Sequence, residues 1–195
     1  MDRETVLNEF RDAGALLEGH FILSSGLRSP VYLQCARVLM DPKRAGRLCG
    51  ALADTVREAV GSDFACTVAP AMGGVIVGYE MARQLGVPGL FTERVDGSFQ
   101  FRRGFGLEPG TKVLMVEDVV TTGLSSRECI AAIEAAGGEV VAECCLIDRS
   151  NGSADVGVPL IPLVALDAPT YEVANLPDEL KAIEAVKPGS RGLKA

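Results

Sequence analysis

The sequence predicts an α/β fold: a doubly wound, mostly parallel sheet flanked by helices, with a small N-terminal hood region. Short apolar runs of strand length alternate with stretches of helical periodicity along the 195-residue chain. These runs are continuously apolar, which is typical of strands that are buried on both faces of a parallel sheet. The length fits one domain, which we expect to span residues 1–195.

The hood region is predicted over residues 1–40. It begins with a helix whose apolar residues are spaced for one face: Val6, Leu7, Phe10 and Ala13. Two short strands follow at residues 21–23 and 31–33, on either side of a turn at residues 24–26. The next helix begins at Asp41-Pro42, a capping residue followed by a proline suited to the first turn, and ends at Gly61.

The sheet is predicted from the remaining apolar runs, at residues 64–69, 89–92, 113–116 and 140–147, with 160–166 as a fifth. Helical patterns at residues 75–85 and 124–136 separate most of them, which indicates βαβ units. Residues 93–110 are the exception, because this glycine-containing segment is longer than a usual connection. We expect it to be a mobile binding loop.

Composition and charge exclude several classes of protein. The chain has 19 Lys and Arg against 26 Asp and Glu, a net charge of −7, which argues against nucleic-acid or membrane-surface partners. No apolar run reaches the roughly 18 residues of a membrane span, and residues 1–4 do not begin a secretory signal. Six cysteines without a C-x-x-C pair favour buried, reduced thiols and a cytoplasmic location. His20 is the one histidine, which argues against a His-based zinc site or triad.

The chemistry is concentrated in residues 113–123, where a buried strand ends in Glu117 and Asp118 and a small-residue turn leads into a helix. Free amide groups at that helix start form an anion site. Ser125 and Glu128 have capping-box spacing. The two acids would repel a phosphate, so we expect them to accept hydrogen bonds from sugar hydroxyls or to hold the hydration shell of Mg²⁺. Together these features predict a ribose 5-phosphate site; the alternative is two solvated acids beside a plain turn.

Residues 116–123, Val-Glu-Asp-Val-Val-Thr-Thr-Gly, resemble the phosphoribosyl pyrophosphate signature of type I phosphoribosyltransferases. Four further segments, at residues 19–26, 29–32, 70–74 and 146–149, resemble the orotate phosphoribosyltransferase family. The end of the chain, at residues 185–190, is similar to a shorter bacterial branch of that family. The resemblance covers nearly the whole chain.

The resemblance implies the type I phosphoribosyltransferase fold and a Mg²⁺-dependent reaction of pyrimidine (UMP) biosynthesis. Orotate and phosphoribosyl pyrophosphate would give orotidine 5′-phosphate and diphosphate. It also implies a homodimer in which the 93–110 loop reaches the neighbouring site. Mg²⁺ would be held mainly by the substrate diphosphate and water, with no firm protein ligand.

The same resemblance implies roles for particular residues. Those for phosphoribosyl pyrophosphate are Arg94, Glu117, Asp118, Val119, Val120, Thr121, Thr122, Gly123, Leu124 and Ser125. Those for orotate are Ser24, Ser25, Gly26, Thr121 and Arg149, and the catalytic set is Asp118, Arg102 and Arg103. The chemistry of Arg149 agrees, because a guanidinium fork matches the carboxylate of orotate in two hydrogen bonds. Its alternative is a surface ion pair with Asp148 or Asp155.

The sequence departs from better-known members of the family, which carry lysines and a histidine in the mobile loop. Here that loop has neither, and Arg102 and Arg103 supply charge but do not readily release a proton. Met72-Gly73 also stands where a Tyr-Lys pair can occur in members of the family, and Ser24 stands where a lysine can occur. We therefore expect electrostatic stabilisation of an oxocarbenium-like centre and a departing diphosphate. The alternative for the two arginines is a solvated basic patch.

Two other functions compete with this interpretation. The first is a phosphoribosyltransferase for another base, such as a purine or uracil, which would not need a carboxylate clamp at Arg149. The second is a non-catalytic sensor of phosphoribosyl pyrophosphate that regulates transcription. The chain shows no basic helix or helix-turn-helix appendage, which argues against the sensor.

Overall fold

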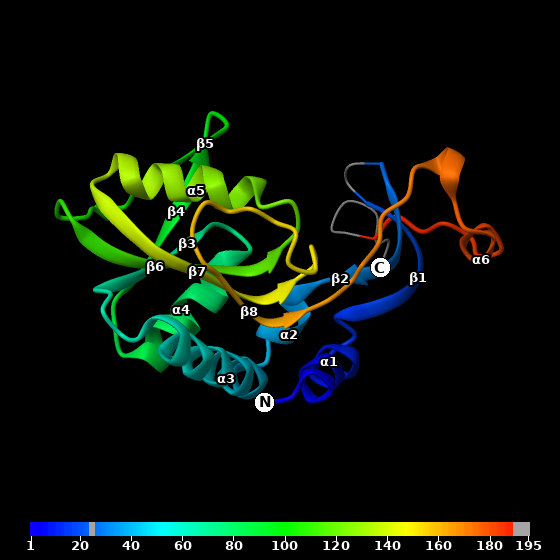
Figure 1. The fold of residues 1–195 in the computed structure, drawn as a ribbon, viewed down its shortest axis with the longest axis horizontal. Helices are drawn as coiled ribbons and strands as arrows, with labels where there is room; N and C mark the ends of the chain where they lie inside the picture. Colours follow the sequence, from blue (N-terminus) through cyan, green and yellow to red (C-terminus); the bar gives the residue numbers. More distant parts are fainter. Residues whose placement is uncertain (24–25, 189–195) are drawn as a thin grey trace.

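The computed structural model describes residues 1–23 and 26–188; the predicted orotate residues Ser24 and Ser25 lie outside that range. Figure 1 shows a central sheet between two layers of helices, with the hood beside it. The six strands stand in the order β5-β4-β3-β6-β7-β8. Their bounds are β3 (Cys66–Pro70), β4 (Gly89–Val95), β5 (Ser98–Phe101), β6 (Thr111–Val120), β7 (Gly138–Asp148) and β8 (Leu160–Ala165).

All neighbouring strands of this sheet are parallel except β4 and β5, which are antiparallel. The doubly wound, mostly parallel sheet is therefore confirmed. Strand β6 is longer than the apolar run at 113–116, because its pairing with β7 continues to Val120↔Asp148. Glu117 and Asp118 consequently lie within the paired part of β6, near its carboxyl end, and not beyond the strand.

Each face of the sheet has its own core. Leu114 and Val116 of β6 pack into a core with α3 (Pro42–Val60) and α4 (Gly74–Leu85). Val113 and Met115 point to the opposite core, beneath α5 (Leu124–Ala135). Successive residues of a strand face opposite sides, so burial on both faces explains why this run is apolar throughout. In the part of the chain that the structure describes, no helix is long and apolar enough to span a membrane.

The start of α3 follows the sequence prediction. The side chain of Asp41 accepts hydrogen bonds from the backbone N–H groups of Lys43 and Arg44, at 2.9 and 3.2 Å. Pro42 occupies the first turn, and Gly61 ends the helix with a φ of +74°. This capping satisfies amide groups that a helix start otherwise leaves without partners.

The hood contains α1 (Arg3–Asp12), β1 (Leu16–Ile22), β2 (Arg28–Leu33) and α2 (Cys35–Leu39), with β1 and β2 antiparallel. The C-terminal segment, with a 3-10 turn (Val173–Asn175) and α6 (Asp178–Lys181), returns to the hood (Figure 1). Single bridges join Phe21 to Val186 and Arg28 to Tyr171. The C-terminal segment thus pairs with both strands of the hood, at Phe21 near the end of β1 and at Arg28 at the start of β2.

Residues 93–110 differ from the single long loop that the sequence predicts. Strand β4 runs on to Val95 and forms a hairpin with β5. The turn between them is Asp96-Gly97, and both residues have positive φ, +49° and +89°. Two such residues fit the tight hairpin turns that match the twist of a sheet. The part of the segment without helix or strand is therefore residues 102–110. The mobility of the segment stays a prediction.

A close contact between α4 and the sheet gives a test of the packing. A Cβ on Gly78 would lie 2.6 Å from the Cβ of Ala69, whereas one on Gly50 in α3 would lie 3.6 Å from the nearest atom, Oε1 of Gln84. We expect Gly78→Ala to lower the free energy of unfolding by about 1–3 kcal/mol, because neither backbone is free to move apart. Gly50→Ala, the matched control, should raise it by about 0.5–1 kcal/mol through helix propensity. Urea denaturation of both variants measures the difference, and equal effects would contradict it.

Candidate active site

The candidate site lies where the sheet order reverses. From β3 the chain passes through α4 to β4 on one side, and from β6 through α5 to β7 on the other. Such a switch point leaves a crevice at the carboxyl ends of two neighbouring strands. The turn after β3 meets the end of β6 there, since a Cβ on Gly73 would lie 3.4 Å from Oδ2 of Asp118. The turns that follow β3 and β6 therefore lie together at this edge of the sheet.

The turn at residues 121–123, here called the phosphate turn, leads directly into α5. Gly123 caps the helix with a φ of +72° and has no side chain to occupy the first amide groups. A Cβ there would lie 3.0 Å from Cγ1 of Val156, so the position requires glycine. Thr121 and Thr122 are exposed beside it. This arrangement suits a phosphate, which is attracted by free N–H groups and the positive end of the helix dipole.

The predicted capping box is not formed. Helix α5 begins at Leu124, so Ser125 lies inside its first turn and Gly123 takes the capping position. Glu128 instead forms an ion pair with Arg94, Nη2 to Oε2, at 2.5 Å. The capping-box spacing is present, but Gly123 in the left-handed conformation starts the helix two residues earlier than a cap at Ser125 would. Leu124 and Ser125 remain exposed at the helix start, as a ligand-binding role requires.

The two acids at the end of β6 are not equivalent. Glu117 is buried, and burial raises its pKa to about 9, with the charges of Asp118 and Glu143 adding to the effect. Asp118 is half-buried, and its Oδ1 accepts a hydrogen bond from the N–H of Val119 at 2.8 Å. Burial also raises the pKa of Asp118, while that hydrogen bond lowers it. Glu117 therefore holds a proton at neutral pH in the free protein, and Asp118 is the acid that is open to a sugar hydroxyl.

Arg149 follows β7 and is held at the site by a hydrogen bond from its N–H to the carbonyl of Val120, 2.8 Å. Its Nε is buried and has no hydrogen-bond partner among the residues that the structure describes. Asp148 accepts instead from Ser150 and Gly152, and Asp155 accepts from Gly157. No ion pair of Arg149 with either acid is present in the described chain. Burial lowers the pKa of this guanidinium, and an anionic ligand would supply the partner that it lacks.

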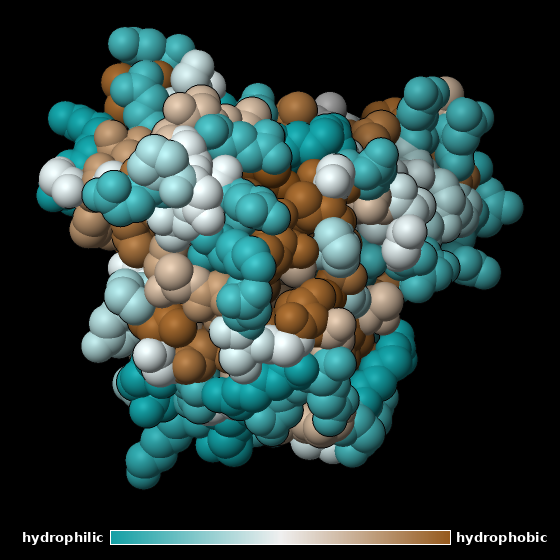
Figure 2. All heavy atoms as spheres, turned by 60° about the vertical axis from the view of Figure 1, so that its left-hand side comes forward, coloured by the Kyte–Doolittle hydropathy of each residue, from teal (hydrophilic) through white to brown (hydrophobic). Residues whose placement is uncertain are grey.

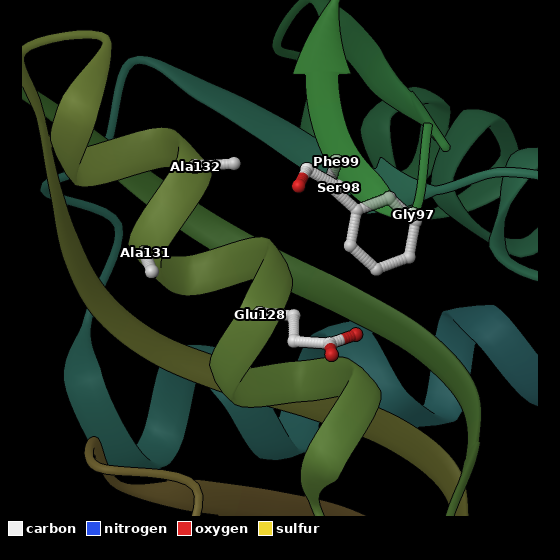
Figure 3. Close-up of a pocket in the computed structure, with 6 residues that line it drawn as sticks. All are labelled: Gly97, Ser98, Phe99, Glu128, Ala131 and Ala132. Carbon is white, nitrogen blue, oxygen red and sulfur yellow. The ribbon is translucent and has the colours of Figure 1, made fainter. Parts of the chain in front are cut away.

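Each of the three predicted arginines, Arg94, Arg102 and Arg103, forms an ion pair with an acidic side chain. The guanidinium of Arg94 stacks on Phe99, 4.2 Å from Cζ to the ring centre, beside the pocket that Figure 3 shows between α5 and the hairpin. Arg102 and Arg103 both pair with Glu93, the first at 3.5 Å from Nη1 to Oε2. The structure thus brings none of the three into contact with the phosphate turn. Their roles at the site stay predictions.

Comparisons with known proteins identify the family of the chain. The phosphoribosyl transferase domain family matches residues 39–157. An orotate phosphoribosyltransferase of Rhizorhabdus wittichii is 63% identical over 195 residues, which is 100% of both chains. One of Maricaulis maris is 61% identical over 193 residues, 99% of this chain and 100% of that one. The chain belongs to the orotate phosphoribosyltransferase family.

Solved structures support the fold of this family member. Orotate phosphoribosyltransferase from Aeropyrum pernix superposes with a TM-score of 0.67 at 26% identity, covering 83% of this chain and 93% of that one. An adenine phosphoribosyltransferase reaches 0.66 at 16% identity, covering 80% and 99%, which shows a shared fold alone. The predicted family, fold class and class of enzyme, a pentosyl transferase, are confirmed.

Sequence reasoning missed three residues of this phosphoribosyltransferase that surround the phosphate turn. Cys35 of the hood contacts the carbonyl of Asp118, 4.0 Å from Sγ to the oxygen. Arg127 donates to the carbonyls of Thr122, at 3.2 Å, and of Asp155, and so ties the turn to the following loop. Glu143 is buried beneath α5. Only Glu143 carried a signal, as a charged residue within an otherwise apolar run.

Proposed function

We propose that the chain transfers ribose 5-phosphate from 5-phospho-α-D-ribose 1-diphosphate to orotate, giving orotidine 5′-phosphate and diphosphate in pyrimidine biosynthesis. The observation that carries the proposal is Arg149, a half-buried guanidinium without an acidic partner among the described residues, next to the phosphate turn. Orotate is a base with a carboxylate, and the guanidinium fork binds that group in two hydrogen bonds. The named relatives at about 60% identity support the same substrate.

In this mechanism the residues bind and orient two substrates. The amide groups of residues 121–125 hold the 5-phosphate, and Asp118 accepts a hydrogen bond from a ribose hydroxyl. Thr121 and Arg149 orient orotate, with its ring nitrogen toward the sugar. The new C–N bond forms at the anomeric carbon as the bond to diphosphate breaks, through a centre of oxocarbenium character, and the proton of that ring nitrogen is released together with the diphosphate. The negative charge of Asp118 near the sugar stabilises that centre.

Mg²⁺ fits the site as a partner of the substrate. Among the described residues no group of three or more acidic, cysteine or histidine side chains is arranged to hold a metal. Mg²⁺ usually keeps several waters and binds through substrate phosphates with one or two carboxylates. Asp118, the more exposed acid, is the residue that would face such a hydrated ion. When bound, Mg²⁺ supplies charge neutralisation on the diphosphate.

A homodimer with the 93–110 loop reaching the neighbouring site is part of the proposal. Three exposed apolar side chains support the dimer: Met72, two residues before α4, and Ile76 and Tyr79 within α4, which are 84%, 50% and 70% exposed. Apolar residues also gather in the centre of the face drawn in Figure 2. Such patches mark interaction surfaces. The six free, buried cysteines support a reducing, cytoplasmic location.

The loop arginines give a prediction for catalysis. Both arginines are exposed and pair with the half-buried Glu93, and ion pairs of exposed arginines contribute little to stability. We expect the double variant Arg102→Ala/Arg103→Ala to keep its melting temperature but to lose about tenfold or more in kcat, because two charges near the departing diphosphate are removed. Product inhibition by diphosphate should weaken as well. Unchanged kinetics and inhibition would assign the two residues to a solvated patch.

The substrate is tested with a panel of bases. Purified protein is mixed with phosphoribosyl pyrophosphate, Mg²⁺ and one base at a time, and the absorbance of that base is followed. We expect orotate to be consumed only when all components are present, and uracil, adenine and hypoxanthine to remain. Consumption of another base in place of orotate would reassign the enzyme. No consumption at all, together with tight binding of phosphoribosyl pyrophosphate, would favour a sensor.

A further inference from the structure

A fully buried acid lies beneath the start of α5. Glu143 is 0% exposed on β7, in register with Met115 of β6 and Leu160 of β8. Its Oε1 accepts a hydrogen bond from the hydroxyl of Ser126 at 2.7 Å, and Ser126 is itself buried. Its Oε2 is buried and has no hydrogen-bond partner within the described chain. This contact joins the first turn of α5 to the centre of the sheet.

An acidic side chain is energetically unfavourable at this buried position. Met115 and Cys145 point into the same core, so a leucine or methionine at position 143 would bury its whole side chain at no polar cost. Burial raises the pKa of Glu143 to about 7, and Glu117 adds a second acid to the same layer. The hydroxyl of Ser126 lowers the pKa only in part. Stability alone does not explain the residue.

The position of Ser126 indicates what the contact does. It is the third residue of α5, three residues after Gly123, so any shift of Ser126 carries the amide groups of the phosphate turn with it. On the outside, Arg127 fixes the turn to the loop at Asp155. On the inside, the Sγ of Cys129 lies 3.3 Å from Oγ1 of Thr92, one turn further along the helix, while Ile130 and Ile133 pack into the apolar core. Apolar contacts are not directional, whereas a hydrogen bond fixes rotation and height.

We propose that Glu143 is a positioning residue, which holds the first turn of α5 through Ser126 and thereby sets the amide groups that bind the phosphoribosyl group. The inference rests on the proposed function only for the ligand of the phosphate turn. It does not depend on the base that accepts the sugar, so binding of phosphoribosyl pyrophosphate tests it separately from turnover of orotate.

The experiment measures the Kd of Mg²⁺–phosphoribosyl pyrophosphate by titration calorimetry for the full chain and three variants. Glu143→Leu and Ser126→Ala both remove the contact, and each should weaken binding about tenfold. Glu143→Gln keeps the acceptor and the shape, so it should stay within about twofold of the wild type. Combining Ser126→Ala with Glu143→Leu should cost no more than Glu143→Leu alone, because one interaction is lost only once.

A matched control separates positioning from stability. Thr67 on β3 donates a buried hydrogen bond to the carbonyl of Gly78 in α4, at 3.3 Å, so Thr67→Val removes a comparable contact under the other helix. It should lower the melting temperature without changing the Kd. The proposal is overturned if Glu143→Leu and Ser126→Ala lower the melting temperature but bind normally, or if Glu143→Gln binds as poorly as Glu143→Leu. If the Kd values change as expected but the wild-type protein does not turn over orotate, the proposed function is overturned and the positioning role of Glu143 stands.

Discussion

Replacing Arg149 with alanine is expected to lower kcat/KM for orotate by about ten- to a hundredfold, the usual loss for a pair of hydrogen bonds to a charged group. The KM for phosphoribosyl pyrophosphate should change by less than about twofold, because the phosphate turn is built from other residues. The free energy of unfolding should change little. The guanidinium has no acidic partner among the described residues, so its removal leaves no unpaired carboxylate behind. Steady-state kinetics with each substrate varied in turn measures both values.

Two further variants sharpen this prediction. Arg149→Lys keeps the charge but not the planar fork, so it should recover only part of the loss. Arg57→Ala is a control, because Arg57 pairs with Asp54 and Gln84 on the surface of α3. It should leave the kinetics unchanged. If Arg149→Ala turned over orotate as well as the wild type does, the carboxylate clamp would be wrong and another base would become the better substrate.

Asp118→Asn is expected to lower kcat by about a hundredfold while leaving the melting temperature nearly unchanged. The amide keeps the shape of the carboxylate and an oxygen to accept from the N–H of Val119, but it removes the negative charge beside the sugar. Because burial already raises the pKa of Asp118, a neutral group there costs the fold little. Kinetics and thermal denaturation of the same preparation separate the two effects.

Glu117→Gln is the matched comparison, and it should lose less than about tenfold. Glu117 has a pKa of about 9 in the free protein, so at neutral pH the amide replaces a group that is already uncharged. A large drop in melting temperature for Asp118→Asn, with normal activity per folded molecule, would remove Asp118 from the chemistry. Equal losses for both variants would mean that the two acids act alike, against their different burial.

The order of the elements and the start of the site were predictable from local sequence. The apolar runs are buried on both faces of the sheet, so strands β3, β6 and β7 are predictable from their apolar composition. The Asp41 cap depends on neighbouring residues only. The acids and the small-residue turn likewise lie within one short segment, so local sequence was sufficient to predict a phosphate site there.

The parts that were not predictable depend on contacts between distant segments. The bridge from Phe21 to Val186 joins residues far apart in the chain, and no local sequence pattern indicates that they pair. The difference between Glu117 and Asp118 comes from burial in a layer shared with Glu143, which no spacing reveals. The pairing of Glu128 with Arg94 likewise joins α5 to β4 and replaces the capping role that spacing favoured.

The most direct test of the account is a stoichiometric one on the wild-type protein. Orotate lost, orotidine 5′-phosphate formed and diphosphate released are measured in one time course, with phosphoribosyl pyrophosphate and Mg²⁺ present. The account predicts equal amounts of all three, and no change when either addition is omitted. Diphosphate released without loss of orotate, or loss of orotate without orotidine 5′-phosphate, would contradict the transfer reaction assigned to this site.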